Sequence, residues 1–146
     1  MIYDLSNTLA ASIVCEYLAQ DLWRHCDEQN SALVVKRDLL LEALDEHLGE
    51  LCCWSMPAGG LFLWLRFPED VDRDRLQSLA DARGFRYARG RSFHVAADDV
   101  PYLRLAFGHV PAEAIREGVP VLAQCLREAR TSNEPARPAS LFRSPT

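Results

Sequence analysis

The segment Tyr102–Phe107, YLRLAF, places a charged side chain inside a short apolar run. Side chains of a strand alternate between its two faces, so Leu103 and Leu105 share one face and Arg104 lies on the other. A guanidinium can bind a carboxylate or phosphate through two parallel hydrogen bonds, and burying it without an anion costs free energy. Arg104 therefore predicts an anion partner, which is either a carboxylate of the protein or a group of a ligand.

The other reactive residue types show no catalytic or metal-binding spacing. The five cysteines include no CxxC pair, and the four histidines have no Glu or Cys at ligand spacing. This pattern argues against a zinc site and against a disulfide framework. The Ala58-Gly59-Gly60 run lacks the lysine and the spacing of a phosphate-binding loop. We therefore expect reduced thiols, and neither a metal site nor a catalytic residue within this chain.

Arginines alternate with aromatic residues in the segment 83–93, RGFRYARGRSF. Such alternation is one signature of single-stranded nucleic-acid binding. The net charge of −5 and the lack of a recognisable binding module argue against that function. We expect neither a nucleic acid nor a membrane as a partner.

Length and composition predict one globular domain. The chain has 146 residues, of which 49% are hydrophobic and 25% charged. No apolar run approaches the roughly 20 residues that span a bilayer, and the N-terminus lacks the pattern of a secretory signal. These features predict a cytoplasmic protein.

The elements that would position Arg104 follow from apolar spacing and capping residues. Helices are predicted over 6–28, 33–48 and 70–83 and from Pro111 onward. The polar run 27–31 is expected to separate the first two helices, and Gly49 to end the second. Pro120 removes a hydrogen bond inside the last helix, so we expect that helix to break near Gly118.

Apolar runs predict strands at 51–56, 61–67, 85–88 and 102–107, with an irregular loop over 89–99. The 61–67 run is apolar on both faces except at Arg66, which predicts a central strand covered on both sides. Strands joined by helices in this order predict an α/β (α+β) sandwich with its helices on one side of the sheet.

Four segments in order, MPAGGLFLWLRFPEDVD, GFRYARGRSF, YLRLAF and IREGVPVLA, resemble the C-terminal part of class I/II aminotransferases of fold type I. The resemblance is to the branch of 2-aminoadipate-type and multi-substrate aminotransferases, and it covers residues 5 to 129. It implies a small α+β domain with a short, mostly antiparallel sheet. The implied division is an interdomain helix or linker at 1–30 and an aminotransferase-like small domain at 31–130. The composition of 131–146, rich in Ser, Pro, Arg and Asn, predicts a disordered tail.

The resemblance also implies roles for particular residues. In this family the arginine matching Arg104 holds the α-carboxylate of the substrate. The glycines matching Gly59 and Gly60 form the turn into the first main strand, and the loop matching Gly90 to Phe93 lies near the substrate entrance. Arg89 stands where the family usually has a proline, a departure that bears on the shape of this loop and on substrate preference.

Parts of the family's active site have no counterpart in the chain. The lysine that forms a Schiff base with pyridoxal phosphate, and the groups that bind this cofactor, belong to a large domain that precedes this region. Lys36 is the only lysine, and it matches a basic position of the interdomain helix. The resemblance thus implies the small domain of a pyridoxal-phosphate-dependent aminotransferase, inactive alone. Its implied partners are the large domain, an amino acid or 2-oxo acid, and a second subunit of a homodimer.

Two other hypotheses remain open at this point. Some bacterial transcription regulators carry an aminotransferase-like effector domain behind a DNA-binding domain. Their motifs usually diverge around GGLFLW and LRLAF, both of which are kept here, and this favours the enzyme. A stand-alone interaction domain is supported only by the brevity of the chain.

Overall fold

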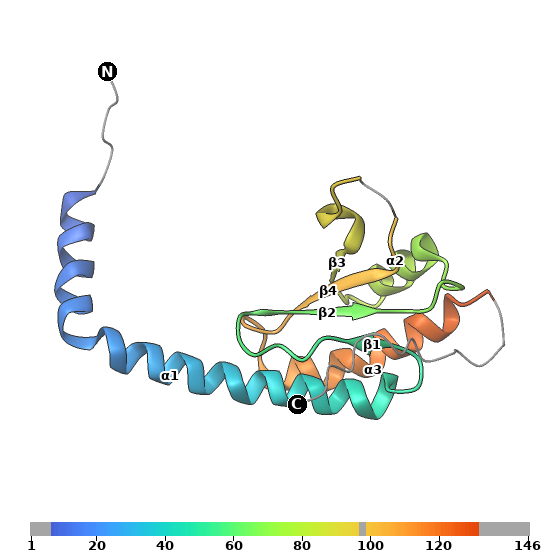
Figure 1. Ribbon diagram of the computed structural model, residues 1–146, viewed down its shortest axis with the longest axis horizontal. Coiled ribbons are helices and arrows are strands. Elements are labelled where there is room, and N and C mark those ends of the chain that lie inside the picture. Colours follow the sequence, from blue (N-terminus) through green and yellow to red (C-terminus); the bar gives the residue numbers. More distant parts are fainter. Residues whose placement is uncertain (1–6, 97–98, 132–146) are drawn as a thin grey trace, which may run out of the picture. The chain divides into compact units, whose positions relative to one another are not determined.

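The computed structural model describes residues 7–96 and 99–131 (Figure 1). Contacts divide the chain into two units, with the boundary between Ala32 and Leu33. Among the described residues, the first unit is helical from Thr8 onward, and the second contains every strand. Within this described part, no helix is both long and apolar enough to cross a membrane. Of the predicted tail at 131–146, all but Thr131 lies outside the described residues.

Helix α1 runs without interruption from Thr8 to Leu48, so the predicted separation at residues 27–31 is wrong. This range contains no glycine or proline. Arg24 pairs with Asp21 at 2.7 Å and with Glu28 at 3.0 Å, and ion pairs at these spacings stabilise an exposed helix. The polar run is therefore a solvated helix surface rather than a helix end.

Polar side chains cap the starts of α1 and α2, and a glycine follows the end of α2. Asn7 accepts a hydrogen bond from the Ala10 N–H at 3.0 Å at the start of α1. Helix α2 is shorter than predicted, Arg73–Ala82, because Asp72 caps it by accepting the N–H groups of the second and third residues that follow. Gly84 follows α2 with φ +72°, a conformation that favours glycine.

The sheet contains four short strands: β1 (Cys53–Trp54), β2 (Phe62–Arg66), β3 (Ala88–Arg89) and β4 (Tyr102–Ala106). Their order is β1-β2-β4-β3, and every neighbouring pair is antiparallel. The predicted fold class, α+β with a short antiparallel sheet, is confirmed. Strand β3 begins later than the predicted 85–88 strand, because Phe85 and Tyr87 pack against the hydrophobic core instead.

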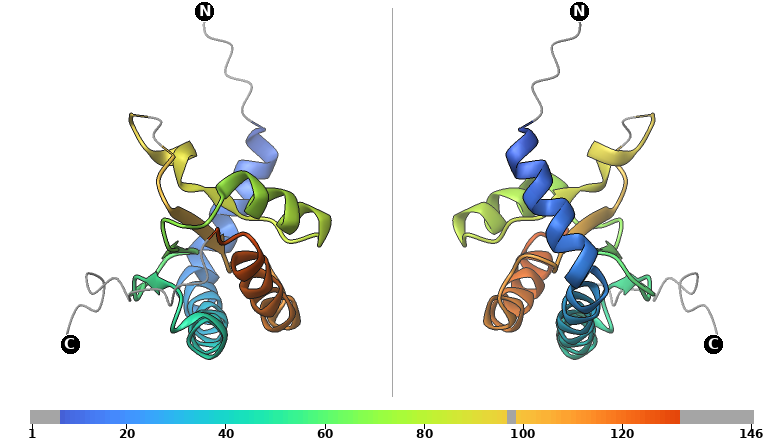
Figure 2. Two further views of the ribbon diagram at one scale, coloured as in Figure 1. Left: turned by 90° about the vertical axis from the view of Figure 1, so that its right-hand side faces the viewer. Right: turned by 90° about the vertical axis from the view of Figure 1, so that its left-hand side faces the viewer.

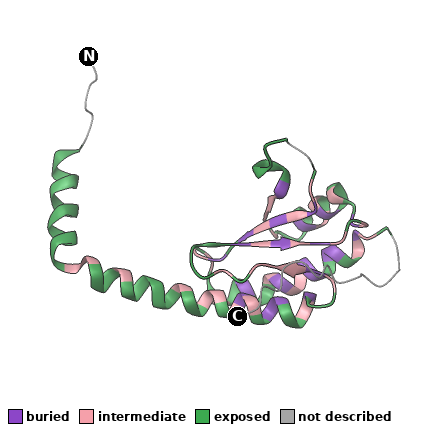
Figure 3. Cartoon of the chain, in the orientation of Figure 1, coloured by how far each residue is buried: buried purple, intermediate pink, exposed green. Residues whose placement is uncertain are grey.

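Helices cover one face of this sheet. Leu63 and Leu65 of β2 and Leu103 and Leu105 of β4 point into the core, and all four are buried. Figure 2 shows α2, α3 (Ala112–Glu128) and the second-unit part of α1 on this side, and Figure 3 colours the buried stretches of these elements purple. Burying one such leucine contributes about 1.5–3 kcal/mol of transfer free energy.

Among the described residues of the second unit, no α-helix lies over the opposite face of the sheet. Phe62 is 43% exposed, and Trp64 and Arg66 are half-buried. Within the second unit, the prediction of a strand covered on both sides is therefore wrong. The 61–67 run is apolar on both faces except at Arg66, so its pattern did not separate the inner face from the outer one, whose large aromatic residues resemble core.

Helix α3 is uninterrupted, so the predicted break near Gly118 is wrong. Pro120 removes only the hydrogen bond to the Arg116 carbonyl, and Arg116 is exposed, so water can replace that donor. The buried stripe of α3 offsets the remaining cost. Gly118 instead permits close packing, because a Cβ atom there would lie 3.0 Å from the Phe85 ring.

The half-buried phenol of Tyr87 makes the domain less stable at alkaline pH. Burial raises its pKa to about 12, against about 10 in an unfolded chain. The unfolded state loses this proton first, so the free energy of unfolding falls as pH rises from about 10 through about 12. Tyr87→Phe should reduce this fall by about 1 kcal/mol, a value discounted for partial exposure. Urea unfolding of both proteins at pH 9 and pH 12 measures the difference, and equal falls would contradict the prediction.

Candidate functional site

Arg104 lies half-buried on the open face of the sheet, in a strand that is hydrogen-bonded on both sides. The register places it opposite Trp64 of β2 and opposite Ala88 of β3. Because β4 is a central strand, its backbone holds the base of the Arg104 side chain in a fixed position. The direction of the guanidinium then depends on what the side chain touches.

Two phenyl rings pack against the Arg104 guanidinium. Its central carbon lies 4.0 Å from the centroid of the Phe62 ring and 4.2 Å from that of the Phe93 ring. No carboxylate among residues 7–96 and 99–131 lies within 4.0 Å of its nitrogens. In that part of the chain, Arg73 Nε is the only buried side-chain nitrogen or oxygen atom without a hydrogen-bond partner. The nitrogens of Arg104 are therefore not in that state. The N–H groups of Arg104 therefore reach solvent and are available to an anion.

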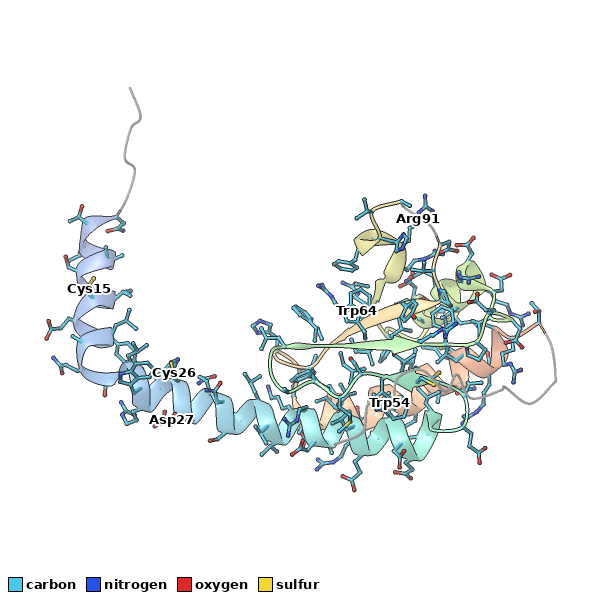
Figure 4. The ribbon with its side chains drawn as sticks, viewed as in Figure 1. Cys15, Cys26, Asp27, Trp54, Trp64 and Arg91 are labelled. Atoms are coloured by element: carbon cyan, nitrogen blue, oxygen red, sulfur yellow. The ribbon has the colours of Figure 1, made fainter. Side chains whose placement is uncertain are left out.

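A cavity of about 410 Å³ opens on the same face beside Arg104. Its walls are mainly aromatic and apolar and include Trp54, Trp64, Phe93, Val100 and Tyr102. Trp54 and Trp64 are labelled in Figure 4. Trp64 and Phe93 meet edge to face, with ring centroids 5.3 Å apart. Arg104 is not part of the wall, but it contacts Phe93 and lies opposite Trp64. The arrangement suits a molecule with a carboxylate and an apolar group.

The loop predicted to shape the site contains a 3₁₀ turn, η1 (Gly90–Phe93), which brings Phe93 to Arg104. Gly90 is buried against β4, where an added Cβ would lie 2.8 Å from the carbonyl oxygen of Tyr102. Gly90 and Phe93 therefore both lie at the Arg104 site. Gly59 and Gly60 lie in the turn before β2, where Gly60 has φ +87°.

Arg89, at the position where a proline was expected, ties this loop to α2. Its guanidinium pairs with Asp74 at 2.8 Å and with Asp99 at 3.4 Å. The hydrogen bond to Asp74 raises the pKa of Arg89, against the opposing effect of burial. An ion-pair anchor thus replaces the rigidity that a proline would have supplied.

Ion pairs also account for other arginines in this part of the chain. Arg83 donates to both carboxylate oxygens of Glu128, at 2.9 and 2.8 Å, and to the sulfur of Cys125 at 3.2 Å. The hydrogen bond from Arg83 lowers the pKa of Glu128. Because Arg83 and Arg89 are paired with carboxylates, the 83–93 segment presents less free positive charge than its sequence suggests. This argues against a nucleic-acid groove.

Phe62 and Trp64 were missed as site residues in the sequence. The signal was present, because both have the same parity along β2 as Arg66 and so share a face with that charged side chain. What the sequence could not show is that β2 pairs with β4, which brings these rings to a residue about 40 positions away. Only the antiparallel register joins them.

Lys36 makes a structural contact. Its Nζ donates a hydrogen bond to the Gly108 carbonyl at 3.0 Å, which joins α1 to the loop after β4.

The described part of the chain holds no group of three or more His, Cys, Asp or Glu that could bind a metal ion. None of the five cysteines forms a disulfide, and burial raises the pKa of Cys52.

No model of a protein family matches the chain. The chain is 33% identical over 124 residues to aromatic-amino-acid aminotransferase 1 of Thermococcus litoralis, an alignment that covers 84% of this chain and 30% of that protein. The crystal structure of the multiple substrate aminotransferase from Thermococcus profundus matches with a TM-score of 0.78 and 36% identity, over 86% of this chain and 32% of that one. The chain is homologous to the C-terminal domain of fold-type I aminotransferases.

These matches confirm the resemblance seen in the sequence. The aminotransferase-like domain spans about 30% of the length of these relatives. It also matches the uncharacterized HTH-type transcriptional regulator YdfD of Bacillus subtilis, with 26% identity over 124 residues. That alignment covers 84% of this chain and 25% of the regulator.

The described residues of the aminotransferase-like domain do not fit pyridoxal phosphate by themselves. Lys36, the only lysine, bonds to Gly108 and lies on α1, outside the open face of the sheet. The Gly59-Gly60 turn offers no lysine for a phosphate group. The residues of this chain therefore suit the binding of a carboxylate, and not of the cofactor.

Proposed function

We propose that this chain is the small domain of a pyridoxal-phosphate-dependent aminotransferase, in which Arg104 binds the α-carboxylate of the amino acid and of the 2-oxo acid. The observation that carries this proposal is the state of Arg104. Its guanidinium is held by two aromatic rings, and its N–H groups have no carboxylate partner among the described residues. Similarity to aminotransferases of 33% and 36% identity supports the same role.

In the proposed enzyme this chain binds and orients the substrate. Two parallel hydrogen bonds from a planar guanidinium fix both the position and the plane of a carboxylate. The aromatic cavity beside Arg104 excludes water around the rest of the substrate. A large domain, absent from this chain, supplies the cofactor and its lysine, and the complete protein acts as a cytoplasmic homodimer.

Transamination by the complete protein is the direct test of this proposal. The chain joined to the large domain encoded upstream should transfer an amino group from an amino acid to a 2-oxo acid when pyridoxal phosphate is added. Release of the 2-oxo acid product, followed with a coupled dehydrogenase, measures the reaction. A folded full-length protein that binds the cofactor but transfers no amino group from any of the twenty amino acids would contradict it.

We expect the chain alone to form no specific covalent adduct with pyridoxal phosphate. The amine of Lys36 is half-buried and bonded to the Gly108 carbonyl, and a Schiff-base lysine requires an uncharged, accessible amine. Reduction with borohydride and mass spectrometry should show the same low level of modification in the wild type and in Lys36→Arg. A stoichiometric adduct that disappears in Lys36→Arg would show this expectation to be wrong.

A second candidate is the effector domain of a transcription regulator. The match to an HTH-type regulator over 84% of this chain favours it, although at lower identity than the match to the aminotransferases. The sequence encoded upstream separates the two functions. A winged-helix domain there would support the regulator, and a large domain with the cofactor lysine but no winged helix would support the enzyme.

A further inference from the structure

We propose that Phe62 and Phe93 are positioning residues for Arg104, whose rings hold the guanidinium while leaving all its N–H donors free for a carboxylate. This inference deepens the proposed function and rests on it. The two rings come from different elements, β2 and η1, and converge on a side chain of β4.

The type of group that contacts the Arg104 guanidinium decides how many of its N–H donors remain for a ligand. A carboxylate partner would occupy two N–H donors and neutralise the charge, so a substrate would have to displace it. An aromatic ring instead attracts the cation through its π-face and uses no donor. Distances of 4.0 and 4.2 Å from the guanidinium carbon to the two ring centroids lie well within the range of this interaction. The rings thus orient the guanidinium of Arg104 and leave its N–H donors available to a carboxylate.

The exposure of the rings supports a role beyond packing. Phe62 is 43% exposed and Phe93 is 46% exposed, although the core offers buried sites to other aromatic residues such as Phe67 and Phe107. Neither ring therefore stabilises the fold mainly by burial. Phe93 is itself held in place, because its ring meets Trp64 edge to face.

The loop that carries Phe93 is anchored at its other end. Gly90 lies against the backbone of β4, and Arg89 pairs with Asp74 of α2. These contacts fix the start of η1 relative to the strand of Arg104. The position of the second ring is therefore set by the fold and does not depend on a ligand.

The test uses the 146-residue chain labelled with ¹⁵N-arginine. Loss of one side-chain Nε–Hε signal in Arg104→Lys assigns the Arg104 signal. Ring currents should displace this signal upfield from those of exposed arginines. Phe62→Leu and Phe93→Leu should each reduce the displacement, whereas Phe93→Tyr, which keeps the ring, should preserve it. Thermal unfolding checks that each variant is folded.

The same samples are titrated with pyruvate, a small 2-oxo acid, at constant ionic strength. Each leucine variant should raise the dissociation constant about fivefold, whereas Phe93→Tyr should stay within about twofold of the wild type. A purely structural role of the rings would lower the melting temperature without changing this constant.

Two outcomes would overturn the inference, and they are distinguishable. If Arg104→Lys binds pyruvate as the wild type does, the carboxylate site is wrong and the inference fails with it. If Arg104→Lys binds more weakly but both leucine variants bind as the wild type does, the carboxylate site stands and only the positioning role fails.

Discussion

Arg104→Lys in the full-length protein is expected to weaken amino-acid binding at least tenfold, which corresponds to about 1.4 kcal/mol. Lysine keeps the positive charge but lacks the planar fork that donates two parallel hydrogen bonds to a carboxylate. Hydrogen bonds to charged groups contribute roughly 1.5–3 kcal/mol each, so the loss of one accounts for the change. Binding of the cofactor should be unaffected, because its contacts lie in the large domain.

Substrate KM and melting temperature, measured together, distinguish a binding role for Arg104 from a structural one. A binding residue raises KM and leaves the melting temperature nearly constant. A structural residue lowers the melting temperature, and the enzyme that stays folded keeps its KM. Arg91→Lys is the matched control, since Arg91 is an exposed arginine of η1 and no contact joins it to Arg104 among the interactions of the described residues (Figure 4). An unchanged KM in Arg104→Lys would refute the proposed role.

Gly90→Ala is expected to lower the free energy of unfolding by about 1–3 kcal/mol, the usual cost of overpacking. The added Cβ would lie 2.8 Å from the Tyr102 carbonyl oxygen and 2.9 Å from a methyl carbon of Val100. The carbonyl belongs to the backbone of β4, which is paired on both sides and cannot easily move. The start of η1 must shift instead, and Phe93 would shift with it.

Gly59→Ala provides the control for this substitution. A Cβ at Gly59 meets nothing within 4 Å, and its φ is not positive, so its effect on the free energy of unfolding should stay within about 0.5 kcal/mol. Urea unfolding followed by circular dichroism measures both variants. Equal stability of Gly90→Ala and the wild type would mean that η1 moves without cost and that its packing on β4 does not hold Phe93.

Local patterns predicted the elements of this fold well. Alternation in β4 correctly assigned Leu103 and Leu105 to the core, because the period of a strand is two whatever its neighbours are. Helical spacing located α2 and α3 for a similar reason. Arg104 was identified as a candidate from its place in that alternation.

Features that depend on distant contacts were not predictable in the same way. Nothing local indicates that Phe62 and Phe93 lie against Arg104, because that contact requires the pairing of β2 with β4 and the folding of η1 onto β4. The two helix breaks that were wrongly predicted, in α1 and α3, came from local signals that tertiary or side-chain contacts override. Polar residues and Pro120 are local signals for ending a helix, and side-chain ion pairs in α1 and the buried stripe of α3 outweigh them.

Within the described residues of the second unit, α-helices cover only one face of the sheet, and this has a consequence for how the domain can evolve. On β2 and β4 the odd-numbered side chains carry the stability of the fold, whereas the even-numbered ones, from Phe62 to Arg66 and from Tyr102 to Arg104, face the cavity side. We therefore expect adjacent positions to be under different selection. Substitutions at even positions can alter what is bound at little cost to folding, and a new specificity can arise from single changes while the inner row of leucines stays constant.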